Sequence, residues 1–167
     1  MILTRIGGSG AHAPSSHAAS WPRNRHRRHA VRSHTASRVT EAPPAPAAEA
    51  EAHFARRLAL ETDCDDVHAA LAGGAPDFVL LDARGPAAFA RGHVPGALNL
   101  PHRAITPERM AAWAADTLFV VYCAGPHCNA ADRAALRLAR CGRPVKLMIG
   151  GLTGWQDEGF ALATGPG

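Results

Sequence analysis

A strand, a tight loop, a helix and a second strand follow one another in the last third of the chain, and this order restricts the fold more than any other feature. The runs Phe78 to Leu81, Leu118 to Tyr122 and Lys146 to Ile149 are mainly apolar and have the length of buried strands. Between the last two, alanine and leucine recur at helical spacing from Asn129 to Cys141, and Gly142 ends the helix. Strands linked through helices require right-handed crossovers and parallel pairing. The sequence therefore predicts an α/β fold with a central, mostly parallel sheet flanked by helices.

Two helices are expected ahead of these strands. From about Glu49 onwards, apolar residues are interleaved with charged ones in a helical pattern. Asp63 and Asp65 then offer N-caps for a second helix, which runs to Leu71 and stops at a pair of glycines. We assign residues 49–167 to one domain, because a chain of 167 residues with 47% hydrophobic content can hold one ordinary core but hardly two.

Residues 1–48 differ in composition from the rest and are expected to form a disordered tail, basic at first and then rich in alanine and proline. They show no apolar periodicity that could build a core. The first 40 residues carry a net charge of +7 and the remaining residues −3, so the pI near 9.3 is a property of the tail. This composition fits an organelle transit peptide. We favour a mis-assigned start codon, with Val39 as a candidate non-AUG start.

Charge, hydropathy and cysteine usage argue against several classes of protein. The folded part is slightly acidic, which gives no reason to expect a nucleic-acid binder. The sequence has no run of about 18 apolar residues, as a transmembrane helix needs, and no secretory type of apolar stretch near its N-terminus. The four cysteines lack the spacing of a disulfide framework and are expected to be reduced thiols. We therefore expect a cytoplasmic protein without a transmembrane segment.

The chemistry is expected in the loop between the strand that ends at Tyr122 and the following helix. Cys123 comes directly after this strand, and ligands of parallel α/β sheets bind beyond the carboxyl ends of strands. A tight loop at a helix start is expected to bring several backbone N–H groups together. Such a nest would hold the pKa of Cys123 well below the free value of about 8.5 and give a thiolate. The remaining residues of this active-site loop are Ala124, Gly125, Pro126, His127, Cys128 and Asn129.

The loop alone has a second interpretation. Free cysteines are among the most buried residues, so Cys123 could be a small hydrophobe at the end of a strand. The loop by itself does not decide between these two roles. Three further segments of the chain favour the catalytic one.

These segments resemble the signature of the rhodanese family. Leu80 to Arg84 reads Leu-Leu-Asp-Ala-Arg, residues 89–101 read Phe-Ala-Arg-Gly-His-Val-Pro-Gly-Ala-Leu-Asn-Leu-Pro, and residues 150–155 read Gly-Gly-Leu-Thr-Gly-Trp. With Cys123 in register between them, the resemblance covers about residues 55 to 160. Four blocks in the right order and spacing are specific, whereas any one of them would be weak. The resemblance implies a small three-layer rhodanese-type fold.

It also implies an activity. In the rhodanese family the cysteine thiolate attacks the outer sulfur of a donor such as thiosulfate, releases sulfite and holds the sulfur as a persulfide until an acceptor removes it. This chain would move sulfane sulfur from thiosulfate, mercaptopyruvate or a persulfide to a thiol or protein acceptor through Cys123. No metal or organic cofactor is needed. Phosphatases of related fold have a loop one residue longer that carries Arg, so phosphate transfer is disfavoured here.

The other residues of the signature have structural interpretations. Asp82 and Arg84 stand at the carboxyl end of a strand and are expected to pair across the turn. His93 is expected to be a structural histidine rather than a general base, and Trp155 is expected to pack in the core. Turns that a side chain could obstruct are expected at Gly96, Gly150 and Gly151.

The loop departs from the common pattern of the family in its charge. Common rhodanese loops carry Arg or Lys for the anionic end of the donor, whereas this loop has neither, so thiosulfate is expected to be a poor donor. Pro126 also removes one N–H group from the nest. The candidate cations for contact with a substrate are His127, Arg103 and Arg133, although solvated surface is the expected place of both arginines.

Cys128 leaves two interpretations open. It could resolve a persulfide or sulfenate on Cys123 by forming a disulfide, or it could fill space at the start of the helix. The alternative function is therefore a non-enzymatic rhodanese-fold module that binds a partner or senses redox state through Cys123 and Cys128. A zinc site made of these two cysteines and His127 lacks a fourth ligand at suitable spacing.

Overall fold

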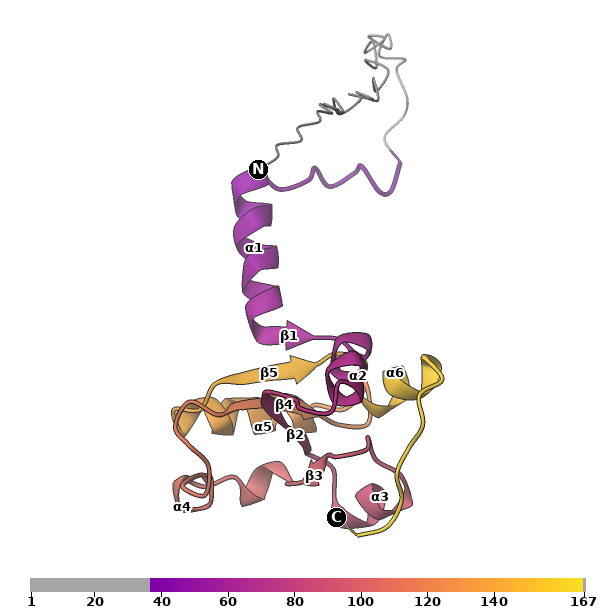
Figure 1. Cartoon of the computed structure of the whole chain (residues 1–167). Coiled ribbons are helices and arrows are strands. Elements are labelled where there is room, and N and C mark those ends of the chain that lie inside the picture. The colour runs from indigo at the N-terminus through magenta and orange to yellow at the C-terminus, as the bar shows by residue number, and fades with distance from the viewer. Residues whose placement is uncertain (1–36, 167) are drawn as a thin grey trace, which may run out of the picture. The chain divides into compact units, whose positions relative to one another are not determined.

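A parallel sheet forms the centre of the domain, as the order of strands and helices predicts. The computed structural model describes residues 37–166, and the chain divides after Pro44 into two units, of which the second contains the sheet. Within the described residues, five strands pair in parallel in the order β1-β5-β4-β2-β3 (Figure 1). The strands are β1 (Glu61–Thr62), β2 (Phe78–Asp82), β3 (Leu98–Asn99), β4 (Leu118–Tyr122) and β5 (Val145–Met148). The predicted α/β class is confirmed.

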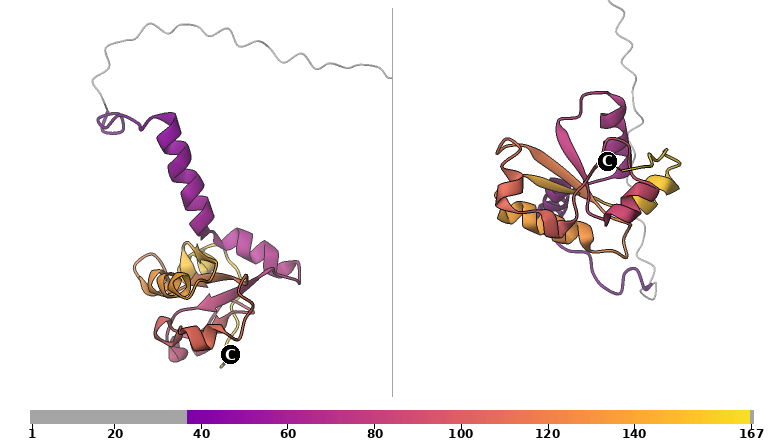
Figure 2. Two further views of the ribbon diagram at one scale, coloured as in Figure 1. Left: turned by 90° about the vertical axis from the view of Figure 1, so that its left-hand side faces the viewer. Right: turned by 90° about the horizontal axis from the view of Figure 1, so that it is seen from below.

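Helices cover both faces of this sheet. The helices of the described residues are α1 (Ala47–Leu60), α2 (Cys64–Ala72), α3 (Pro86–Arg91), the short 3-10 helix η1 (His102–Ala104), α4 (Pro107–Met110), α5 (Ala130–Arg140) and α6 (Gly151–Asp157). The first of them, α1, buries no side chain and is not among the helices that cover the sheet. One buried cluster joins Met110 of α4 and Leu138 of α5 to the sheet. The other joins Val67 of α2 and Trp155 of α6 to it. Figure 2 shows the resulting layers, with the sheet between two sets of helices.

The helices expected from about Glu49, from Asp63 and from Asn129 are α1, α2 and α5. Asp63 caps α2, because its carboxylate accepts a hydrogen bond of 2.8 Å from the backbone N–H of Asp66. Asp65 lies inside the first turn of α2 and does not cap it. The short elements β1, β3, α3, α4 and α6 were not among the expected ones, because two to seven residues carry too little periodicity.

The expected tail can be followed only in part. Residues 37–46 contain turns and bends but no helix or strand, and α1 begins at Ala47, close to the predicted boundary at residue 48. Residues 1–36 lie outside the described part, so the prediction of disorder and the proposal of a start at Val39 remain predictions. Among the described residues, α1 buries none of its own side chains.

An ion pair closes the carboxyl end of β2. The Asp82 side chain is fully buried. Its carboxylate accepts hydrogen bonds from the Nε and Nη2 atoms of Arg84, the latter at 2.5 Å. Arg84 also donates to the carbonyl of Gly92, at 2.6 Å. Asn99 at the end of β3 donates to the carbonyls of Asp82 and Arg84. A buried carboxylate is tolerated only with such partners. The expected pair therefore forms, and it ties the segment after β2 to the neighbouring strand.

The first turn of α6 lies directly against the loop that follows β4. The backbone N–H groups of Leu152 and Thr153 donate to the carbonyls of Cys123 and Ala124, each at 2.9 Å. This approach needs glycine at position 151, which has a φ of +59°. A Cβ atom there would lie 2.6 Å from the carbonyl oxygen of Cys123. The turn that was expected at Gly151 thus brings α6 into such close contact with the Cys123 loop that a side chain has no room there.

We predict that Gly151→Ala destabilises the protein much more than Gly142→Ala. Both glycines have positive φ, but nothing lies within 4 Å of a Cβ atom at Gly142. The Gly142 variant should lose about 1 kcal/mol from backbone strain, and the Gly151 variant about 3 kcal/mol because the loop must also move. Urea unfolding followed by circular dichroism measures both. Equal losses in the free energy of unfolding would show that the contact between α6 and the loop does not exclude a side chain at position 151.

Candidate active site

Cys123 lies at the carboxyl end of β4, at the bottom of a small hollow. Its side chain is only 3% exposed. The hollow has a volume of about 190 Å³ and lies between the loop, the first turn of α5 and the end of β5. Gly150 and Gly151 form part of its wall. Because β4 is paired on both sides, the position of Cys123 is set by the sheet.

Cys128 borders two hollows. It lines the Cys123 hollow and also a more open one, whose wall includes Ala124, His127 and Asn129. The side chain of Cys128 is half-buried, whereas His127 and Asn129 are exposed and Gly125 is buried. Asn129 stands at the N-cap position of α5, but its side chain makes no capping hydrogen bond. Cys128 therefore lies between the buried sulfur of Cys123 and the open surface.

The surroundings of Cys123 favour its thiol form over the expected thiolate. Its Sγ donates a hydrogen bond to the carbonyl of Cys128, with the two atoms 3.0 Å apart. Burial raises the pKa of Cys123, the N–H groups of Ala131 and Gly125 lower it, and the side chain of Cys128 raises it further. The expectation of a pKa well below the ordinary value is not met, because burial outweighs the N–H groups that lower the pKa.

The pKa of Cys128 moves in the opposite direction. The N–H group of Ala130, at the start of α5, lowers it, as does the hydrogen bond with Cys123. A helix N-terminus stabilises a thiolate because its first N–H groups have no partner within the helix. The surroundings therefore favour a thiolate on Cys128 more than on Cys123.

The structure does not bring Arg103 or Arg133 to either hollow. The charged side chain that lines both is Asp132, which sequence reasoning missed. The two arginines lie instead around His102, on the side where η1 packs against α5. Asp132 and Arg133 are neighbours in the sequence, but they are about 100° apart around the helix. Only the rotation of α5 on the sheet decides which of them faces Cys123.

The remaining signature residues have structural contacts. The ring of His93 stacks on Phe89, with centroids 3.7 Å apart, and its Nδ1 lies 3.0 Å from the Phe89 carbonyl. Trp155 is 1% exposed and donates through Nε1 to the carbonyl of Ala161. Gly96 has a φ of +81°, which a turn requires. None of these three lines the hollow of Cys123.

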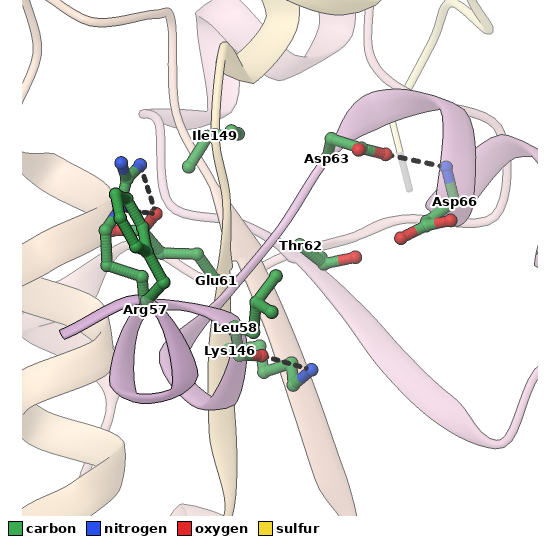
Figure 3. Close-up of a pocket in the computed structure, with 9 residues that line it drawn as sticks. Arg57, Leu58, Glu61, Thr62, Asp63, Asp66, Lys146 and Ile149 are labelled. Atoms are coloured by element: carbon green, nitrogen blue, oxygen red, sulfur yellow. Dashed lines mark hydrogen bonds and ion pairs between the residues drawn. The ribbon is translucent and has the colours of Figure 1, made fainter. Parts of the chain in front are cut away.

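A larger groove lies elsewhere, between the end of α1, β1 and β5 (Figure 3). Three of its charged side chains have partners, since Arg57 pairs with Glu61 at 2.7 Å and Lys146 donates to the carbonyl of Leu58. No cysteine lines it. Within residues 37–166, no group of three or more metal-ligating side chains comes together, and no helix is long and apolar enough to cross a membrane. The Cys123 loop is therefore the candidate active site.

Comparison with known proteins shows the family of this chain. Residues 63–158 match the model of the rhodanese-like domain family, so the chain belongs to that family. The BH2092 protein from Bacillus halodurans has a similar structure, with a TM-score of 0.67, 30% identity, and coverage of 70% of this chain and 85% of that one.

Two further similarities concern longer proteins. A thiosulfate sulfurtransferase from Pseudomonas aeruginosa has a TM-score of 0.53 and 25% identity, over 71% of this chain and 22% of that one. The HTH-type transcriptional regulator Rv0324 of Mycobacterium tuberculosis is 35% identical over 92 residues, which are 54% of this chain and 40% of the regulator. The chain thus spans less than half the length of either protein.

We predict that iodoacetamide at neutral pH labels Cys128 before Cys123, because Cys128 is more exposed and its pKa is lowered. In Cys128→Ser, labelling of Cys123 should occur at lower pH, because the interaction that raises its pKa is removed. Peptide mapping by mass spectrometry over a pH series measures both rates. Cys64 is an internal control, since burial raises its pKa to about 11. Faster labelling of Cys123 than of Cys128 in the unmodified chain would contradict this assignment.

Proposed function

We propose that this protein is a sulfurtransferase that carries sulfane sulfur as a persulfide on Cys123. The observation that supports this most is the place of Cys123 at the end of β4, where it faces a hollow large enough for a sulfur atom and its attached group. The N–H groups of Gly125 and Ala131 are directed at this sulfur. They would stabilise an anion there, whether it is a thiolate or a persulfide. Membership of the rhodanese-like family is compatible with this chemistry.

The reaction would proceed in two steps. The Cys128 thiolate takes the proton of Cys123, and the Cys123 thiolate attacks the outer sulfur of the donor. With thiosulfate, the sulfur–sulfur bond of the donor breaks and sulfite leaves with its electron pair, so that Cys123 becomes a persulfide. An acceptor thiolate then attacks the terminal sulfur and restores the Cys123 thiolate. This is covalent catalysis, which predicts ping-pong kinetics. The two steps need no metal or organic cofactor.

The charge of the hollow bears on the choice of donor. Asp132 lines it, and no arginine or lysine does. A carboxylate at this place repels a dianion such as thiosulfate, and mercaptopyruvate to a lesser extent. We therefore propose a persulfide as the better donor. The missing guanidinium also argues against phosphate transfer. The four cysteines are all unpaired, which fits our proposal that the reaction takes place in the cytoplasm.

A gain of about 32 Da, the mass of one sulfur atom, should appear on the peptide that contains Cys123 after incubation with a low-molecular-weight persulfide. Thiosulfate and mercaptopyruvate should give a smaller gain. Cys123→Ser should abolish the gain, because the nucleophile is missing, whereas Cys64→Ser should retain it. Intact-protein and peptide mass spectrometry measure both. Failure with all three donors would exclude the sulfurtransferase proposal.

A second candidate function is a thiol module that senses redox state. It is favoured by the closeness of the two cysteines. The Cys123 thiol donates a hydrogen bond to the backbone carbonyl of Cys128, and both residues line the same hollow. In this scheme peroxide oxidises the Cys128 thiolate to a sulfenic acid with release of hydroxide. Cys123 then attacks that sulfur, and a disulfide forms with release of water. One relative that matches in this region is named a transcriptional regulator, which is compatible with a sensing role.

The redox scheme predicts a loss of about 2 Da, for two hydrogen atoms, after treatment with an equimolar amount of hydrogen peroxide. A linked peptide pair of Cys123 and Cys128 should appear, and dithiothreitol should reverse it. Either single serine variant should prevent the loss, whereas Cys141→Ser should not. If Cys123 gains sulfur readily and peroxide forms no linked pair, the chain is a sulfurtransferase without this second function.

A further inference from the structure

Three arginines gather around His102, outside the hollow that holds Cys123. Arg103 belongs to η1, and Arg133 and Arg137 belong to α5. The two elements pack against each other. Burial lowers the pKa of His102, and the positive charges of Arg133, Arg137 and Arg103 lower it further. The positive charges of all three guanidinium groups therefore act on the His102 ring. We call these three residues the arginine cluster.

Local structure does not account for the arginine cluster. Arg133 and Arg137 are four residues apart on α5, a spacing at which like charges repel each other. Arg133 also lies near the N-terminus of α5, where the helix dipole disfavours a cation, whereas Arg137 and Arg140 lie in the last turn, where it favours one.

None of the three forms an ion pair within residues 37–166, where the pairs are Arg57–Glu61 and Asp82–Arg84. The Nδ1 atom of His102 is buried beside them and has no hydrogen-bond partner among the described residues. The arrangement thus concentrates positive charge, at some cost to α5, without an internal anion to offset it.

The arginine cluster lies at the same end of the sheet as Cys123. α5 begins directly after the Cys123 loop, and Arg133 is in its first four residues. η1 follows the end of β3 by two residues, and β3 runs parallel to β2 and β4 (Figure 1). Ala134 and Leu138 bury the opposite face of α5 in the core. The exposed face with the arginines is therefore directed to solvent beside the active-site loop.

We propose that the arginine cluster binds an acidic segment of a protein whose thiol exchanges sulfur with Cys123, an inference that rests on the proposed function. Guanidinium groups bind carboxylates in a bidentate manner and steer acidic partners by long-range attraction. A small anion inside the hollow would not touch this surface, since none of the three arginines lines it. Leu136, which is 52% exposed, lies on the same side of α5 as Arg133. An apolar residue among the arginines favours a protein partner over a nucleic acid.

Direct binding tests the surface without any sulfur chemistry. The probe is a fluorescein-labelled peptide of six glutamates and one serine, and its control has glutamine in place of glutamate. Fluorescence anisotropy with the full chain should show binding of the acidic peptide alone. The double variant Arg133→Glu/Arg137→Glu should weaken it about tenfold. Arg56→Glu/Arg91→Glu makes the same change in net charge on other exposed helices and should not. The arginines of residues 1–40 are present in every variant, so the difference reports on the arginine cluster.

Sulfur transfer then tests the link to Cys123. With the persulfide loaded, the cysteine-containing form of the acidic peptide should remove sulfur about tenfold faster than its glutamine counterpart. This ratio should fall to about one in the Arg133→Glu/Arg137→Glu variant and at high salt. The ratio should remain about tenfold in the Arg56→Glu/Arg91→Glu control variant.

Three outcomes would overturn the proposal: no binding of the acidic peptide, equal weakening in both double variants, or tighter binding of a single-stranded RNA of equal charge. If the acidic peptide binds at the arginine cluster but no persulfide forms, the proposed function fails and the surface stands.

Discussion

The hydrogen bonds between the first turn of α6 and the Cys123 loop are the contact on which the site depends. The carbonyls of Cys123 and Ala124 accept from α6. Because a trans peptide unit directs its N–H opposite to its C=O, the N–H group of Gly125 is turned away from α6 and toward the sulfur. Glycine at position 151 permits this approach. One backbone contact thus closes the wall of the hollow and orients a donor at the reacting atom.

Two neighbouring thiols have surroundings that move their pKa values in opposite directions. Cys123 is buried, and a carbonyl accepts its proton, so burial and hydrogen bonding both favour the thiol. Cys128 is more exposed and lies at the N-terminus of α5, which favours the thiolate. Cys128, whose pKa is lowered, therefore lies beside the buried Cys123, and no histidine lines their common hollow. The same proximity underlies both the transfer and the redox chemistry that we propose.

Charge is divided between the hollow and the surface beside it. Asp132 gives the hollow negative character, whereas Arg103, Arg133 and Arg137 lie outside it. This separation disfavours small dianions at Cys123 and favours acidic groups on a larger partner. In this chain the positive charge lies along η1 and α5, where only a molecule larger than the hollow can contact it.

The sequence by itself determined three of the five strands of the described residues, the place of Cys123 after one of them and the pairing of Asp82 with Arg84, because apolar runs and short-range spacing encode them. It also predicted α2 and α5 with nearly the right ends. The tertiary structure decided the direction in which the pKa of each of the two cysteines moves and which charges line the hollow. Both depend on how α5 is rotated on the sheet, since one step along a helix turns a side chain by about 100°. Neighbouring Asp132 and Arg133 thus face different surroundings, and no local pattern could have separated them.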